Sequence, residues 1–264
     1  NVSGPRRVQV GACRDFLLGV RYVDGMGQVI KNGGRVMKNV TGYDLVKLMA
    51  GSWGTLGVLS EVSFKVLPQP EESETLVVAV SEIALAVRVM SAALTSPYDV
   101  SGAAFDPAAG RVLLRIEGFR DSVKYRATQI TALVAGSGDV SLIGPAPEIW
   151  AAVRDVTAFH GQAGDVWRIS VKPTDAPEVA AALKADGLLF DWGGGLIWAR
   201  VPAGTDLRSR ICALQGHATL VRADGATCAD HPMFHPEPPS LAAITRGLRA
   251  RFDPRGIFNP GLMG

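Results

Sequence analysis

The chain has 264 residues, of which 47% are hydrophobic, enough for a packed core in one large domain or two modest ones. Lys and Arg number 27 against 25 Asp and Glu, leaving a net charge of +2, and no basic run is long enough to indicate a nucleic-acid partner. No apolar run reaches the length of a transmembrane segment and no signal peptide is visible. We therefore expect a cytoplasmic protein, and leave open its peripheral association with the inner face of the cell membrane.

The cysteines and the first residue bear on the cellular compartment and on processing of the chain rather than on catalysis. Cys13, Cys212 and Cys228 are widely spaced and form no CxxC pair, a pattern typical of a reducing compartment and insufficient for an iron–sulfur cluster. The chain begins with Asn1 and a turn-like NVSGPRR, which favours an excised or processed start.

The first region, to about residue 67, is rich in glycine and its segments are short. Residues 15–23 and 27–33 flank the connection DGMG, which predicts a β-hairpin. VTGYDLVKLMAGS predicts a helix with Leu45, Leu48 and Met49 on one side, and LGVLSEVSFKVL predicts a strand that ends at the following prolines. The stretch PQPEESE is typical of a linker.

From about residue 75, strands alternate with alanine-rich helices. The expected segments lie at residues 75–80, 81–94, 99–106, 110–119, 122–136, 147–156, 166–173, 176–185, 188–192, 195–202, 206–216 and 217–223. Their order predicts an α+β domain of two similar β-α-β-β-α(-β) halves around antiparallel sheet. A final helix is expected to stop before Asp253, because Pro254 disfavours helical backbone in the residue that precedes it.

The heptapeptide GSWGTLG places Gly51, Gly54 and Gly57 between the predicted helix and strand. These glycines do not form GxGxxG, and they follow a helix rather than a strand, so the dinucleotide-binding fingerprint is absent. Two hypotheses remain. Either the glycines end the helix and let the next strand pack tightly, or they let the backbone approach a flat or phosphorylated ligand. Their spacing does not decide between the two.

A resemblance that extends along the whole chain favours the ligand hypothesis for these glycines. NVSGPRR, the run from residue 14 to 68 with KNVTGYD and GSWGTLG, then WRISVKP, DWGGGLIW, GHATLVRA and FDPRGIFNPG, resemble in order the FAD-binding E subunits of bacterial glycolate oxidases. These belong to the vanillyl-alcohol-oxidase-like, PCMH-type flavoprotein superfamily. The resemblance implies the second half of an FAD-binding domain in residues 1–70, an α+β cap domain in 71–238, and a helix and loop in 239–264 that return to the FAD domain.

Carried over residue by residue, the resemblance also implies which positions lie near FAD. They are Asn1, Ser3, Gly4, Asp15, Lys38, Tyr43, Gly51, Ser52, Gly54, Gly57, Val58 and Asn259. Plainer alternatives stay open for several of them: a simple turn at residues 1–4, capping of backbone amides by Asp15, and burial of Tyr43 in the core.

FAD requires backbone amides for its pyrophosphate and apolar walls for its rings. The Gly-rich pyrophosphate loop of the superfamily has no counterpart in this sequence. The resemblance therefore implies that an N-terminal FAD subdomain is missing, because the chain is a fragment or because its gene start was placed too late. We expect the parent protein to bind FAD, and this chain to bind it weakly or not at all.

The sequence does not identify the catalytic residues. Oxidation of a 2-hydroxy acid requires a base and a cation for the carboxylate. The candidates are His217 beside a predicted strand, and Arg168 and Arg200 on strands next to tryptophans. The alternatives are a histidine satisfied by backbone and arginines in salt bridges. The stretch HPMFHPE is interrupted by two prolines and does not predict a metal site.

Two functions follow from the resemblance. The first is the FAD-binding subunit of a glycolate-oxidising complex, which converts glycolate or a similar 2-hydroxy acid into the 2-oxo acid and passes electrons to an acceptor. Its partners would be the FAD-linked oxidase D subunit and an iron–sulfur subunit. The alternative is a non-catalytic scaffold subunit derived from a flavoprotein. In either case the chain alone is expected to be inactive.

Overall fold

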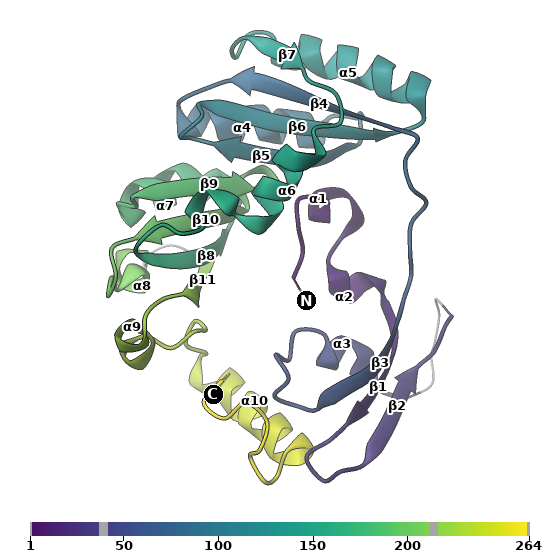
Figure 1. Ribbon diagram of the computed structural model, residues 1–264, viewed down its shortest axis with the longest axis vertical. Helices are drawn as coiled ribbons and strands as arrows, with labels where there is room; N and C mark the ends of the chain where they lie inside the picture. The colour runs from purple at the N-terminus through teal and green to yellow at the C-terminus, as the bar shows by residue number, and fades with distance from the viewer. Residues whose placement is uncertain (1, 37–41, 212–215, 263–264) are drawn as a thin grey trace. The chain divides into compact units, whose positions relative to one another are not determined.

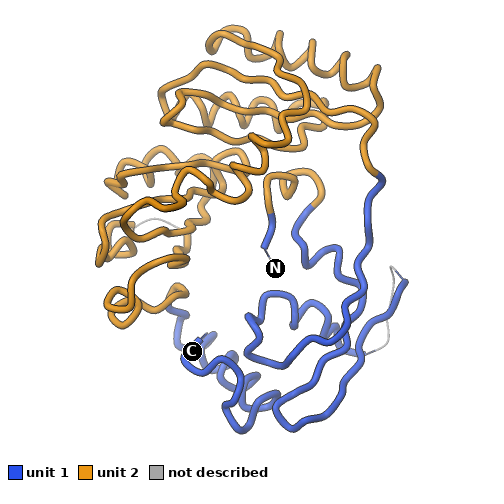
Figure 2. Tube along the Cα trace, in the orientation of Figure 1, with its two compact units in different colours: residues 1–3, 11–68, 236–264 blue, residues 4–10, 69–235 orange. Residues whose placement is uncertain are grey.

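The computed structural model describes residues 2–36, 42–211 and 216–262. The chain divides into two compact units (Figure 2). The first unit comprises Asn1–Ser3, Gly11–Pro68 and Pro236–Gly264, and the second unit comprises Gly4–Val10 and Gln69–His235.

The helices and strands are labelled in Figure 1. The helices are α1 (Arg7–Val10), α2 (Cys13–Phe16), α3 (Leu45–Met49), α4 (Ile83–Thr95), α5 (Arg120–Val134), α6 (Pro147–Asp155), α7 (Ala176–Leu183), α8 (Leu207–Arg210), α9 (Gly225–Asp230) and α10 (Pro239–Phe252). The strands are β1 (Leu17–Val23), β2 (Val29–Gly33), β3 (Val58–Phe64), β4 (Glu72–Ala79), β5 (Val100–Asp106), β6 (Arg111–Gly118), β7 (Val140–Leu142), β8 (Asp165–Val171), β9 (Gly187–Asp191), β10 (Leu196–Val201) and β11 (Gly216–Arg222).

The first unit contains an antiparallel sheet of order β2-β1-β3. The predicted hairpin is confirmed: β1 pairs with β2, and the carboxylate of Asp24 accepts hydrogen bonds from the amides of Met26 and Gln28, which closes the turn. Strand β3 pairs with β1 on the other side. Its apolar side chains are exposed.

The helix α3 is shorter than predicted and buries a different face. It starts at the side chain of Asp44, which accepts a hydrogen bond from the Lys47 amide at 3.1 Å. Val46 and Met49 are buried against β1, whereas Leu45 and Leu48 are only partly buried. The core of the first unit is therefore one small cluster around the fully buried Tyr22.

The second unit contains an antiparallel sheet of order β11-β8-β10-β9-β5-β6-β4-β7 in the part of the chain that the structure describes (Figure 1). In each half the fourth strand pairs with the first, and the two halves meet where β5 contacts β9. Phe105 and Phe190 are opposite each other at this junction, with ring centroids 5.7 Å apart. The predicted pair of split βαβ halves is confirmed.

Helices cover one face of this sheet and form the main core. Residues from α4, α5 and α7 pack on Leu76, Phe105, Trp167 and Phe190, all of them fully buried. On the opposite face, Trp150 and Val153 of α6 pack on β5 and β6. Each face of the first half is thus covered by apolar side chains of this unit.

Two predicted boundaries differ from the structure. The expected linker at residues 68–74 is partly strand, because β4 begins at Glu72 and pairs with β6 as far as Gly118. Helix α8 ends at Arg210, short of the predicted residue 216, and residues 212–215 lie outside the described part. The final helix α10 ends at Phe252, as predicted from the following Asp253-Pro254.

Among the residues that the structure describes, no helix has both the length and the apolar character that a membrane crossing requires.

Candidate functional site

The turn GSWGTLG ends helix α3. Gly51 has a φ of +95°, a left-handed conformation that favours glycine just after a helix. The Ser52 amide donates to the carbonyl of Met49, and the Thr55 hydroxyl donates to the carbonyl of Ser52 at 2.7 Å. These bonds satisfy groups at the helix end and fold the chain back on itself.

The C-terminal loop FNPG contacts the same turn through a side-chain hydrogen bond. The side-chain amide of Asn259 donates to the Trp53 carbonyl at 2.7 Å. A β-carbon on Gly54, whose φ is +68°, would lie 3.0 Å from that amide nitrogen. The turn and the C-terminal loop, about two hundred residues apart in the sequence, therefore form one local structure.

Gly57 serves tight packing. A β-carbon there would lie 2.8 Å from the carbonyl oxygen of Val23 and 2.9 Å from the ring of Tyr22. The three glycines are thus explained by helix termination and close packing, the first of the two hypotheses from the sequence. Their presence alone does not require a ligand.

We expect Asn259→Ala to loosen the turn at residues 51–57. The substitution removes the amide that holds the Trp53 carbonyl, and it places alanine at a φ of +40°, which asparagine tolerates better. The free energy of unfolding should fall by about 1 kcal/mol, and amide hydrogen exchange in peptides covering the turn should accelerate. Asn259→Gly also loses the amide but adopts the positive φ freely, so it should be destabilised less.

A matched control is available in the same unit. The side-chain amide of Asn32 donates to the Tyr43 carbonyl at 3.1 Å, so Asn32→Ala removes a comparable bond at another place. It should leave exchange in the turn unchanged. Wild-type exchange rates in the turn of Asn259→Ala would contradict the proposed role of the amide.

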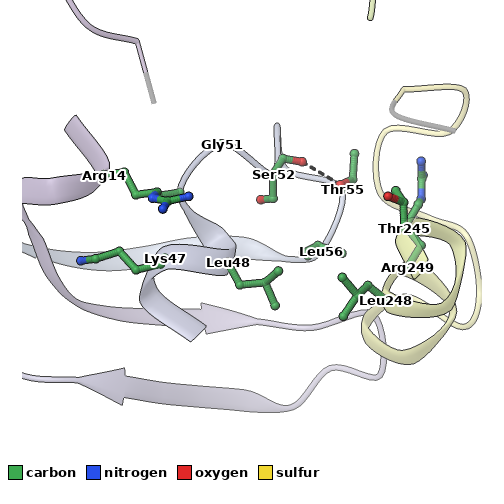
Figure 3. Close-up of a pocket in the computed structure, with 11 residues that line it drawn as sticks. Arg14, Lys47, Leu48, Gly51, Ser52, Thr55, Leu56, Thr245, Leu248 and Arg249 are labelled. Carbon is green, nitrogen blue, oxygen red and sulfur yellow. Dashed lines mark hydrogen bonds between the residues drawn. The ribbon is translucent and has the colours of Figure 1, made fainter. Parts of the chain in front are cut away.

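A pocket of about 480 Å³ lies beside this turn, between it and helix α10 (Figure 3). Its lining residues are Arg14, Lys47, Leu48, Ala50, Gly51, Ser52, Thr55, Leu56, Thr245, Leu248 and Arg249, all from the first unit. Three of these side chains are cationic and none is acidic, and three leucines supply apolar wall. The lining thus suits an anionic ligand that also has an apolar part.

The cations of the pocket are oriented by backbone carbonyls. The ammonium group of Lys47 donates to the carbonyl of Leu17 at 2.7 Å, and the Arg249 guanidinium donates to the carbonyls of Phe258 at 2.9 Å and Asn259 at 3.3 Å. Carbonyls fix the position of a cation but do not neutralise its charge. Lys47 and Arg249 are thus held in place at the wall of the pocket.

Most of these pocket residues were missed by the sequence analysis. Gly51 and Ser52 were predicted, whereas Arg14, Lys47 and Arg249 were not. One local signal was present, since Thr245 and Arg249 are four residues apart and share a face of the predicted C-terminal helix.

Other residues predicted near a cofactor have local structural roles. Asp15 accepts a hydrogen bond from the Ala12 amide at 2.7 Å and caps α2, which was the plainer alternative. The Ser3 hydroxyl accepts from the Cys13 amide at 3.2 Å. The Gly4 carbonyl belongs to the second unit and accepts from the indole of Trp192 at 3.1 Å.

The remaining predicted positions lie away from the core or outside the description. Tyr43 is 89% exposed, so the alternative that it is a core residue is wrong. Tyr43 precedes Asp44, the N-cap of α3, and does not belong to the buried cluster of the first unit. Val58 is exposed at the start of β3. Asn1 and Lys38 lie outside the described residues.

The three catalytic candidates all lie in the second unit, and two of them come together. Arg168 on β8 and His217 on β11 are on adjacent paired strands, and burial together with the charges of Arg168 and His235 lowers the pKa of His217. Arg200 instead donates to the carbonyls of Ala163 at 3.0 Å and Asp186 at 3.3 Å.

Arg200 also lies 3.8 Å from the Asp186 carboxylate, which supports the salt-bridge alternative for it. At the HPMFHPE stretch, and elsewhere in the described ranges, no group of His, Cys, Asp or Glu side chains is arranged to hold a metal ion.

Comparisons with known proteins give the family. No protein-family model matches the chain. The chain is 38% identical over 266 residues to the glycolate oxidase subunit GlcE of Escherichia coli K12, which covers 99% of this chain and 69% of that protein. The chain belongs to the GlcE family. A second relative of this GlcE-family chain is the glycolate oxidase subunit GlcD of Bacillus subtilis 168, 38% identical over 91 residues, or 34% of this chain and 19% of GlcD.

Solved structures agree on the fold of this GlcE-family chain. An alkyldihydroxyacetonephosphate synthase superimposes with a TM-score of 0.65 at 16% identity, covering 98% of this chain and 56% of that one. A VAO-type flavoprotein from Myceliophthora thermophila C1 superimposes with a TM-score of 0.58 at 14% identity, covering 96% of this chain and 57% of that one. The predicted α+β fold is thereby confirmed. The chain spans a little over half of each of these structures.

Proposed function

We propose that this GlcE-family chain is part of the FAD-binding subunit of a glycolate oxidase complex, which oxidises glycolate or a similar 2-hydroxy acid to the 2-oxo acid. The observation that carries the proposal is the 38% identity to GlcE along 99% of the chain. Oxidation of the alcohol removes two electrons and two protons from the substrate. FAD, when bound, supplies the group that accepts the electrons before they pass to an acceptor.

The pocket of the first unit fits part of such a cofactor. FAD combines a doubly charged pyrophosphate with flat, largely apolar rings, so a site for it needs cations without competing carboxylates beside an apolar wall. Arg14, Lys47 and Arg249 would face the anionic part, and Leu56 and Leu248 the apolar part. The volume of about 480 Å³ lies within the usual range for a ligand site, roughly 300–1,000 Å³.

The turn at residues 51–57 would contribute mainly backbone atoms to this pocket. Gly51 and Ser52 form part of the lining without a large side chain, and Asn259 holds the adjacent carbonyl of Trp53. We therefore keep Gly51 and Ser52 as proposed cofactor-side residues, with Asn259 acting through the turn rather than by direct contact.

The partners are also part of the proposal. The relatives of the chain are named as two different subunits of glycolate oxidase, GlcE and GlcD. We propose that a GlcD-type oxidase subunit and an iron–sulfur subunit complete the complex and carry the electrons onward, and that the complex associates peripherally with the inner face of the cell membrane.

The test is an FAD titration of the chain, followed by quenching of flavin fluorescence, with matched arginine variants. Arg14→Gln neutralises a pocket cation, whereas Arg35→Gln neutralises an exposed arginine of the same unit that does not line the pocket. Losing one charge-assisted hydrogen bond to phosphate costs roughly 1.5–3 kcal/mol. We therefore expect the Kd for FAD to rise about tenfold or more in Arg14→Gln and to stay unchanged in Arg35→Gln.

Binding by the chain is expected to be weak, so the same two variants are also measured in the subunit as it occurs in the assembled complex. Equal FAD affinity of Arg14→Gln and Arg35→Gln in the complex would contradict the pocket assignment. An assembled complex that holds no flavin and does not oxidise glycolate would contradict the proposed function, and would favour a scaffold subunit.

A further inference from the structure

Two arginines of the second unit lie against one indole ring. Trp192 sits in the short turn Trp192–Gly194 after β9, and its indole nitrogen donates to the Gly4 carbonyl. The guanidinium carbon of Arg7 is 4.7 Å from the centroid of the Trp192 ring, and that of Arg168 is 5.1 Å from it. The two guanidinium groups are therefore no further apart than the sum of these distances. Stacking on the ring holds each of them in a defined place.

The strand register adds polar side chains beside Arg168. On β8, Trp167 and Ile169 face the helical core, so Arg168 and Ser170 face the opposite side of the sheet. Arg168 pairs with Thr219 and Ser170 pairs with His217 on β11, whose Ala218 and Leu220 face the core. Arg168, Ser170, Thr219 and His217 thus occupy neighbouring positions on one face of the sheet.

This face carries positive charge without an acidic partner. Among the residues that the structure describes, no carboxylate lies within ion-pair distance of Arg7 or Arg168. Burial and the nearby charge of Arg7 lower the pKa of Arg168, and the charge of Arg168 contributes to the lowered pKa of His217. The positive groups therefore repel one another, and an anion placed among them would relieve that repulsion.

Arg115, on the same sheet, shows how a buried arginine of this unit is satisfied when its role is structural. It lies over the ring of Trp150, as Arg168 lies over Trp192, but it also pairs with Glu117 at 3.1 Å and bonds to Ser101 at 3.0 Å. Arg168 has the aromatic contact without the carboxylate. Among the described residues, Arg168 thus differs from Arg115 in having no carboxylate within ion-pair distance.

We infer that Arg168, with Arg7, His217, Ser170 and Thr219 around it, forms a binding site for the carboxylate of a small organic acid. A guanidinium fork matches the two oxygens of a carboxylate, and the hydroxyls and imidazole are placed to hold a neighbouring hydroxyl or the second oxygen. That the acid is a 2-hydroxy acid such as glycolate rests on the proposed function. The site itself is independent of FAD and contains no residue of the first unit.

The test measures carboxylate binding without flavin. Glycolate is titrated into the FAD-free chain by isothermal calorimetry, and glycolamide, its neutral analogue, is titrated in parallel. Arg168→Gln removes the cation, Arg168→Lys keeps the charge but loses the fork, and Arg120→Gln removes an exposed arginine on α5 as the matched control. We expect glycolate to bind at least tenfold more weakly to Arg168→Gln than to wild type, at an intermediate level to Arg168→Lys, and unchanged to Arg120→Gln. Glycolamide should bind far more weakly than glycolate.

The outcomes separate this inference from the proposed function. Wild-type glycolate affinity in Arg168→Gln, equal binding of glycolamide, or no binding by the wild-type chain would each overturn the site. Circular dichroism of Arg168→Lys and Arg168→Gln checks that the fold is retained, and if only the lysine variant folds, its affinity relative to wild type decides. If glycolate binding depends on Arg168 but the assembled complex holds no flavin, the carboxylate site stands and the proposed function fails. If the assembled complex holds flavin and oxidises glycolate but glycolate binding does not depend on Arg168, the proposed function stands and the carboxylate site is wrong.

Discussion

Replacing Glu117 with glutamine is expected to lower the free energy of unfolding by roughly 3 kcal/mol at neutral pH, because a buried arginine would lose its only ion-pair partner among the described residues. The side chains of Arg115 and Glu117 are 8% and 9% exposed, and the Arg115 Nε atom lies 3.1 Å from Glu117 Oε2. Glu117 also accepts from Arg6 and from the hydroxyl of Ser101 at 2.7 Å. Glutamine keeps the shape but removes the charge that balances Arg115.

The charge argument predicts a partial recovery in a double variant. Arg115→Met removes the buried cation, so Arg115→Met with Glu117→Gln should be more stable than the sum of the two single losses indicates. Glu72→Gln is the matched control, because Glu72 forms an exposed pair with Arg120 and such pairs contribute about 0–1 kcal/mol. Urea denaturation followed by far-UV circular dichroism measures the wild type, the two single variants, the double variant and the control. Additive losses in the double variant would contradict the explanation from buried charge.

The difference in stability between wild type and Glu117→Gln depends on pH. Burial raises the pKa of Glu117, but the hydrogen bonds from Arg6 and Ser101 and the charge of Arg115 outweigh it and bring the pKa below its ordinary value. A depressed pKa gives stability that is fully present above the ordinary pKa of a glutamate and is lost as the pH falls through the folded value. The difference between wild type and Glu117→Gln should therefore shrink in acid.

Local patterns in the sequence predicted much of this fold. The DGMG hairpin is built from neighbouring residues, so the carboxylate of Asp24 and its following amides are visible in the sequence itself. The strand start at Glu72 was missed because PQPEESE has the composition of a linker, whereas the strand is fixed by pairing with β6, more than forty residues later. Composition is a local property and strand pairing is not.

Local sequence patterns also predicted only part of the candidate site. GSWGTLG was found as a motif, but the reason for two of its glycines lies in Asn259 and Tyr22, which contact the turn from distant parts of the sequence. Arg14 on α2 and Arg249 on α10 line one pocket although their helices are far apart in the sequence. A sequence motif can locate one side of a pocket, but it does not identify the side chains that other segments contribute to it.

Asp191 is expected to make the chain less stable as the pH rises from about 4 to about 8, which is the opposite sign to Glu117. The residue is 2% exposed, and burial raises its pKa to about 7, against the smaller effects of the Trp192 amide hydrogen bond and the Arg115 charge. Because the unfolded chain ionises near the ordinary value of 3.8, folding holds a proton that is lost only above the folded pKa. The expected loss of stability across this range is about 4 kcal/mol.

Asp191→Asn tests this directly, because asparagine is neutral at every pH and its side-chain oxygen can still accept from the Trp192 amide, which Asp191 binds at 2.7 Å. The variant should resemble wild type near pH 4 and become increasingly more stable than wild type towards pH 8. Comparing the two chains at each pH cancels the titration of His217 and His235, which are present in both. A stability difference that does not change with pH would mean that packing, rather than ionisation of Asp191, separates the two chains. If the difference grows as expected, the Asp191 carboxyl at the end of β9 is protonated in a larger fraction of chains at neutral pH than an ordinary aspartate, and so adds less negative charge beside Trp192.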